Sequence, residues 1–227
     1  HINALKEKYA GEVELLLSLE ADYIPELMGP RHPEILKAQL DYVVGSVHFV
    51  EIFPDGNRWS IDDSTEDFER GINEIFDGDI RKTVTRYFEL QNEMLENQAP
   101  HILGHMDKIR MHNRNRYFFD EKEEWYVNLV RDTLKLAAEK GTVVEINTKY
   151  YSRAGMTFPS SDHFRWMAVH GIPVTLSSDA HKPDNLLSGF KEMVPVLKEN
   201  GIDQLYQYQK GVFRPEKFDE AGLPCKS

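Results

Sequence analysis

Potential metal ligands stand at or just beyond the ends of four short apolar segments. These residues are Glu20, His48, His105 and the pair Asp179 and His181. Neutral imidazoles and carboxylates, with no thiolate among them, suit divalent zinc, manganese or iron. Asp179 and His181 are two residues apart, so on extended backbone both side chains point the same way and can grip one cation or two neighbouring ones. The residue types therefore indicate a metal centre.

Each of these residues also has an ordinary structural interpretation. A strand followed by an Asp-initiated turn would leave His181 merely exposed, and a lone His48 or His105 is more often a hydrogen-bonded structural histidine. The metal site is favoured because the same residue types recur at the same place in successive units. The other internal histidines fall in loops or on helices, and we expect them at the surface or behind the site: His32, His101, His112, His163 and His170.

The elements that must position these residues alternate between strands and helices. Apolar segments predict strands at 13–19, 42–48, 102–105 and 142–147, and from 172 up to the polar segment that holds Asp179, with a small strand at 211–213. Helical spacing predicts helices at 2–8, over 65–98 with a break near 77–78, at about 121–139, from near 161, and at about 184–199. A polar loop at 54–64 is expected over the mouth of the site.

This alternation is typical of βαβ units and predicts an α/β fold with a mainly parallel sheet, either closed as a barrel or open. The strand carboxyl ends of a parallel barrel converge, which would bring ligands distant in sequence together. No internal repeat and no low-complexity linker interrupts the chain, so we expect one domain over residues 1–227.

The composition narrows the classes of function. The chain has 227 residues, of which 41% are hydrophobic, enough for a sizeable core. Its formal charge of −11 and the lack of a basic stretch disfavour nucleic-acid binding. With no long apolar run we expect no membrane span, and with no visible secretory signal we expect a cytoplasmic protein. The single cysteine, Cys225, leaves no disulfide framework and no thiolate metal site.

Five motifs, in order, resemble the PHP superfamily and within it the monofunctional histidinol-phosphate phosphatases. They are LEADY at 19–23, GSVHF at 45–49, GHMD at 104–107, EINT at 145–148 and SDAHKP at 178–183. The resemblance implies a distorted (β/α)7 barrel with two or three divalent metal ions at the strand carboxyl ends. It also implies hydrolysis of L-histidinol phosphate to L-histidinol and phosphate in histidine biosynthesis.

The same resemblance implies roles for individual residues. Glu20 would bridge two metals, His48 and His105 would bind one of them, Asp179 would complete the other, and His181 would serve a third. Asp179 and His181 are thereby the catalytic candidates, and Asp179 is a proton donor if it is not committed to metal. Loop cations would hold the phosphate, and acidic residues would face the substrate amine. The first choices for phosphate are Lys149 and Arg153, the weaker ones Arg110, Arg114 and Arg116, and the acidic candidates Asp22 and Glu51.

The chain departs from the family pattern at its amino-terminal end. The family's opening His-x-His motif, and the histidine that ends its second strand, have no counterpart here, and the first residue is His1 rather than Met. We therefore expect a truncated sequence whose barrel lacks its first two strands, whose metal centre is incomplete and whose activity is very low. Two alternatives stay open: a PHP phosphoesterase for another monoester, such as a nucleotide or phosphotyrosine, and a non-catalytic binding module.

Overall fold

A parallel sheet of five strands forms the centre of the computed structural model, which describes residues 2–220 and 222–223. The strands lie in the order β1-β2-β5-β6-β7 and span Ser18–Asp22, Tyr42–Ser46, Ile102–Leu103, Val143–Asn147 and Val174–Ser177. Every neighbouring pair is parallel, so all five carboxyl ends lie at one edge. This confirms the predicted α/β fold with a mainly parallel sheet.

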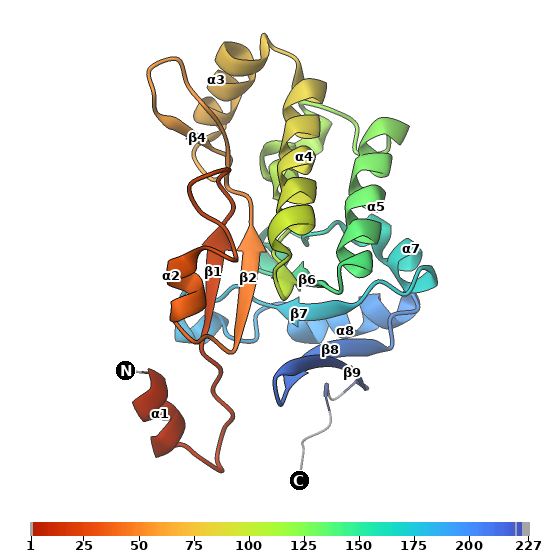
Figure 1. Cartoon of the computed structure of the whole chain (residues 1–227). Coiled ribbons are helices and arrows are strands. Elements are labelled where there is room, and N and C mark those ends of the chain that lie inside the picture. The colour runs from red at the N-terminus through yellow and green to blue at the C-terminus, as the bar shows by residue number, and fades with distance from the viewer. Residues whose placement is uncertain (1, 221, 224–227) are drawn as a thin grey trace.

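Helices of very different lengths connect the strands. They are α1 (Ile2–Lys8), α2 (Pro33–Lys37), α3 (Thr65–Phe76), α4 (Ile80–Gln98), α5 (Glu124–Glu139), α6 (Tyr151–Ala154), α7 (Phe164–Val169) and α8 (Phe190–Glu199). Figure 1 shows α4 and α5 standing side by side above the sheet. Residues of α8 line one cavity together with residues of β7 and β8. The predicted break between the two central helices is confirmed: Asp77 ends α3 in the left-handed conformation at φ 54°.

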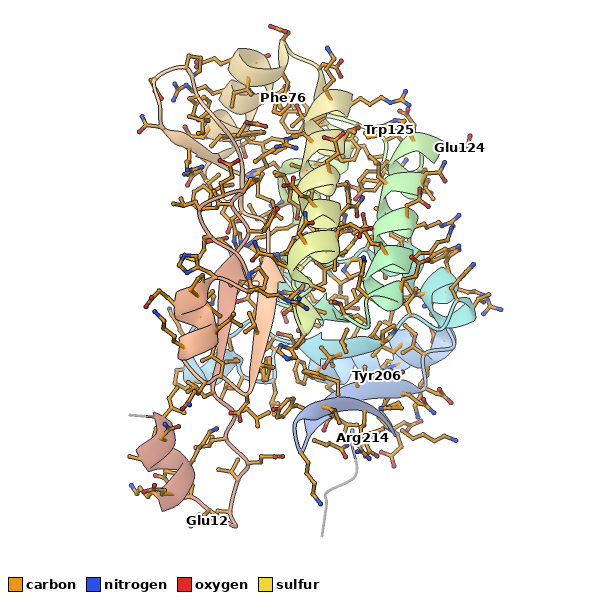
Figure 2. The ribbon with its side chains drawn as sticks, viewed as in Figure 1. Glu12, Phe76, Glu124, Trp125, Tyr206 and Arg214 are labelled. Atoms are coloured by element: carbon orange, nitrogen blue, oxygen red, sulfur yellow. The ribbon has the colours of Figure 1, made fainter. Side chains whose placement is uncertain are left out.

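The core lies between the two long helices α4 and α5 and the sheet. Tyr87, Phe88 and Met94 of α4 are fully buried, as are Val130 and Leu134 of α5. All five residues of β6 are also buried, the pattern of a strand covered on both faces. Figure 2 shows Phe76 at the end of α3 and Trp125 at the start of α5, at the end of the molecule opposite Tyr206 and Arg214.

A hairpin replaces part of the polar loop expected at 54–64. Its strands are β3 (Phe49–Ile52) and β4 (Arg58–Ser60), and the side chains of Trp59 and Ile61 are fully buried. The expectation of a continuous loop over 54–64 is wrong, because residues 58–60 pair with β3 and the Trp59 ring packs against α3. Gly71 of α3 permits that contact, since a Cβ atom at this position would lie 2.0 Å from Trp59 Cε2.

Two other boundaries differ from the prediction. The first strand covers 18–22 rather than 13–19, so Glu20 lies inside it. In place of one small strand at 211–213, β8 (Gln204–Gln209) and β9 (Val212–Lys217) form an antiparallel hairpin. Lys210 and Gly211 join them with φ of 50° and 91°, the two positive values that a tight type I′ turn requires.

The β8–β9 hairpin and the parallel sheet enclose a cavity of about 370 Å³ between them. Its lining includes Val44, Glu145 and Thr175 of the sheet and Tyr206 and Phe213 of the hairpin. Among the described residues, no helix is both long and apolar enough to cross a membrane. Cys225, the single cysteine from which we expected no disulfide framework and no thiolate metal site, lies outside the described residues.

Candidate metal centre

Three of the five predicted metal ligands meet at the carboxyl edge of the sheet. Glu20 lies in β1, while His48 and His105 each lie two residues beyond the ends of β2 and β5. Glu20 Oε1 is 2.8 Å from His105 Nε2 and 3.8 Å from His48 Nε2. One potential ligand atom from each residue lies within 4.8 Å of the other two. Parallel strand ends have therefore brought together residues that are 85 positions apart in the chain.

The donor set fits a single divalent ion. Ligand atoms bound at about 2.1 Å to one tetrahedral ion are separated by roughly 3.4 Å, close to the spacing seen here. Two imidazole nitrogens with one carboxylate oxygen is a set that zinc and its neighbours accept. The His105 side chain is 3% exposed and that of Glu20 40%, so the position opens to solvent on the Glu20 side.

The electrostatics favour a charged carboxylate between the two imidazoles. Burial, the largest cause, raises the pKa of Glu20, but the hydrogen bond from His105 and the charges of both histidines outweigh it and hold that pKa well below its usual range. For His48, burial is again the largest cause and lowers the pKa. The hydrogen bond to Asp22 and the charges of Asp62 and Asp22 outweigh it, so the net effect is a raised pKa. Glu20 is thus ionised at neutral pH, the state that a metal ligand needs.

Asp22 orients the His48 ring. Its Oδ1 lies 2.5 Å from His48 Nδ1, which leaves Nε2 turned toward Glu20. A carboxylate on the far nitrogen fixes the tautomer of a metal-binding histidine and raises its basicity. We predicted Asp22 as a partner of the substrate amine, whereas the structure gives it this histidine as a partner. The spacing of Glu20 and Asp22, two residues apart on one strand, is the signal that could have shown both facing the site.

Asp62 and Lys108 also lie beside the centre, and sequence reasoning missed both. Asp62 Oδ2 is 3.6 Å from His48 Nε2 and 2.8 Å from Lys108 Nζ. Asp62 follows β4, in the segment we predicted as a loop, and Lys108 stands among the basic residues after His105. Their position beside His48 depends on the long-range packing of the β3–β4 hairpin, so their spacing in the sequence does not indicate it.

Gly104 explains how His105 approaches its partners. A Cβ atom at this position would lie 2.3 Å from Ser46 Oγ of β2. Glycine therefore allows the end of β5 to lie directly against β2, and His105 follows one residue later. In the GH pair of the sequence motif, Gly104 thus meets a packing requirement and His105 is the predicted ligand.

Asp179 lies near this centre but belongs to a different set of contacts. Its Oδ2 accepts hydrogen bonds from Lys149 Nζ at 3.0 Å and from Asn147 Nδ2 at 3.3 Å. Asn147 Nδ2 also donates to Glu145 Oε2 at 3.2 Å, and that oxygen accepts the backbone N–H of His105 at 2.7 Å. A continuous hydrogen-bonded path therefore joins Asp179 to the backbone of His105.

The metal roles of Asp179 and His181 stay predictions. In the described part of the chain, the group of side chains that could share one ion consists of Glu20, His48 and His105 alone. The His181 side chain is 71% exposed, and its Nδ1 lies 2.9 Å from the Asp179 carbonyl oxygen.

The basic residues predicted to bind the substrate phosphate lie in two different places. Lys149 pairs with Asp179, while Arg153 lines a cavity of about 460 Å³ together with Arg110, Arg114 and Arg116. Arg110 is committed to Glu121, whose Oε2 lies 2.8 Å from its Nε. Glu51, the other acidic candidate, is paired with Arg86 at 2.8 Å.

Comparison with known proteins places the chain in a family. The model of the PHP domain matches residues 2–149, which is more than half of the chain, so the chain belongs to the PHP family. A "Probable histidinol-phosphatase" from Schizosaccharomyces pombe is 28% identical over 216 residues, which cover 91% of this chain and 66% of that protein. A protein of the same name from Deinococcus radiodurans is 24% identical over 201 residues, covering 88% of this chain and 70% of the relative.

Solved structures share the fold. The "putative histidinol phosphatase hisK" from Listeria monocytogenes superposes with a TM-score of 0.71 at 24% identity, over 84% of this chain and 72% of its own. The histidinol phosphate phosphatase from Lactococcus lactis, complexed with zinc, L-histidinol and phosphate, gives a TM-score of 0.60 at 16% identity, over 94% and 76%. These confirm the PHP-type fold that the motifs predicted. The chain spans about two thirds of the length of the S. pombe relative.

Proposed function

We propose that this chain is the core of a metal-dependent phosphomonoesterase that hydrolyses L-histidinol phosphate to L-histidinol and phosphate. The observation that carries the proposal is the convergence of Glu20, His48 and His105 on one metal-sized position in a PHP chain. Support for the substrate comes from the two relatives, both named as probable histidinol-phosphatases.

The residues of the chain would share the work as follows. Glu20, His48 and His105 hold one divalent ion, and Asp22 keeps His48 oriented toward it. When bound, such an ion activates water for attack and neutralises charge on a phosphoryl group. Asp179 and His181 are proposed to hold the further ions of a cluster of two or three.

Binding of the substrate requires cations that contact its phosphate, and the reaction requires a proton for the leaving alkoxide. Lys149 lies 3.0 Å from Asp179 at the same strand edge and is the better placed of the two phosphate candidates. Arg153 would contribute only to a substrate that reaches the arginine-lined cavity. Where Asp179 is not committed to a metal ion, it is the proposed proton donor to the leaving oxygen, and Lys149 and Asn147 hold it by hydrogen bonds.

The test is phosphate release from L-histidinol phosphate by zinc- or manganese-loaded protein. The near inactivity expected of the 227-residue chain stays a prediction, which the same assay tests. His48→Ala should abolish turnover, whereas His170→Ala, which removes an exposed ring stacked on Trp166, should leave it unchanged. Lys149→Ala should mainly raise KM if the cation grips the phosphate in ground and transition states alike.

Two results would redirect the proposal. Hydrolysis of a nucleotide monophosphate or phosphotyrosine, with none of L-histidinol phosphate, would favour another phosphomonoesterase. Metal binding without hydrolysis of any monoester would favour a binding module.

A further inference from the structure

A buried lysine lies beside the metal centre without a role in the mechanism above. Lys108 comes three residues after His105 and opens the short 3-10 helix Lys108–His112. Its side chain is only 6% exposed, although the ammonium is a strongly hydrated group that is costly to bury. A position this close to a metal ligand therefore calls for an explanation beyond surface solvation.

The contacts of Lys108 place its charge at the mouth of the centre. Nζ lies 2.8 Å from Asp62 Oδ2, and that same oxygen lies 3.6 Å from His48 Nε2. The Asp62 side chain is 38% exposed, so the ion pair is open to solvent on its acidic side.

The hydrogen-bonding capacity of this ammonium is largely unused. It has three donors, and among the described residues only Asp62 accepts a hydrogen bond from Nζ. A buried ion pair with a single shared hydrogen bond stabilises a fold poorly, because desolvation offsets most of the attraction. A further acceptor of negative charge would satisfy the remaining donors.

We propose that Lys108 is a phosphate-binding residue, the second cation that a phosphate group at the Glu20/His48/His105 position meets, and that Asp62 competes with the phosphate for its ammonium. The inference deepens the proposed function, on which it rests for the substrate being a phosphate ester. The net charge supports it: Glu20, Asp22 and Asp62 contribute three negative charges against one positive charge from Lys108. A divalent ion brings this set to neutrality, and without Lys108 a phosphate dianion would meet a net negative site.

The proposal predicts effects of opposite sign for the two members of the pair. Replacing Lys108 removes a contact to phosphate and also a cation that repels the metal. Lys108→Met should therefore weaken phosphate binding about tenfold or more, as expected for a lost charge-assisted hydrogen bond, and tighten zinc binding. Replacing Asp62 removes a negative charge from beside the metal and frees the ammonium. Asp62→Asn should weaken zinc binding and tighten phosphate binding.

The experiment is isothermal titration of the chain in two stages, first with zinc and then, at one equivalent of zinc, with inorganic phosphate. Lys82→Met is the matched control, because Lys82 is a 69% exposed lysine that pairs with Asp79, three residues before it. It should change neither constant. If Lys108→Met fails to fold, as judged by circular dichroism, Asp62→Asn still tests the proposal through the sign of its effect on phosphate.

Two outcomes would overturn the assignment. One is unchanged phosphate affinity in folded Lys108→Met, and the other is weaker phosphate binding in Asp62→Asn, which would mean that the pair only supports the loop. The outcome for the substrate is separate. Loss of phosphate affinity in Lys108→Met, in a protein that never hydrolyses L-histidinol phosphate, would uphold Lys108 and refute the proposed substrate.

Discussion

Replacing Asp22 by Asn tests whether the ring of His48 is held ready for a metal ion. The wild-type carboxylate lies 2.5 Å from Nδ1, so Nδ1 donates a charge-assisted hydrogen bond to it and Nε2 faces Glu20. An amide of the same shape keeps the volume but loses the negative charge. Partners of this kind are worth about 10- to 100-fold in metal affinity. Since the Asp22 side chain is 36% exposed, we expect the lower part of this range, about 10- to 30-fold, or roughly 1.4–2 kcal/mol.

The assay is competition for zinc with a chromophoric chelator at pH 7.5. Asp55→Asn is the matched control, because Asp55 is also a half-exposed carboxylate in an ion pair, but its partners among the described residues are Arg70 and Asn57 rather than residues of the centre. Its zinc affinity should equal that of the wild type. A zinc affinity of Asp22→Asn within twofold of the wild type, in a protein that melts at the same temperature, would refute the orienting role.

Two further predictions concern the stability of the fold. Burial, together with the charge of Arg131, lowers the pKa of His163 to about 4 from 6.5, so the unfolded chain takes up this proton at higher pH than the folded chain does. Its contribution to stability is therefore present above pH 6.5 and is lost as the pH falls toward 4. Urea unfolding should show a loss between pH 7 and pH 5 that is about 2 kcal/mol larger in wild type than in His163→Phe, and equal losses would contradict the shift. Gly71→Ala should destabilise the chain by about 1–3 kcal/mol through the clash with Trp59, despite the better helix propensity of alanine, and Trp59→Phe should relieve part of that cost. A stabilised Gly71→Ala protein would show that the Trp59 ring is not held against α3.

Local patterns were sufficient for the elements that carry a strong period or a buried run. Helices α3, α4 and α5 and strand β6 lie within a few residues of their predicted bounds, because amphipathic spacing and continuous apolar residues report burial directly. That Glu20, His48 and His105 lie close together could be predicted for a related reason. His48 and His105 each follow a strand and Glu20 lies within one, and parallel topology brings such positions together.

The features that the sequence did not show depend on contacts between distant segments. Trp59 reads as part of a polar loop until α3 is placed against it, with Gly71 giving it room. Asp62 and Lys108 are 46 residues apart, and neither has a local pattern that ties it to His48. His163, expected at the surface or behind the site, is only 4% exposed, although it ends the polar segment 160–163.

The most direct test of the metal centre is zinc K-edge X-ray absorption of the chain loaded with one equivalent of zinc. The structure predicts a first shell of nitrogen and oxygen at about 2.0–2.1 Å with the outer-shell scattering of two imidazoles, falling to one imidazole in His105→Ala. A spectrum with a sulfur ligand, or one that His105→Ala leaves unchanged, would contradict the assignment of Glu20, His48 and His105 as the metal-binding residues.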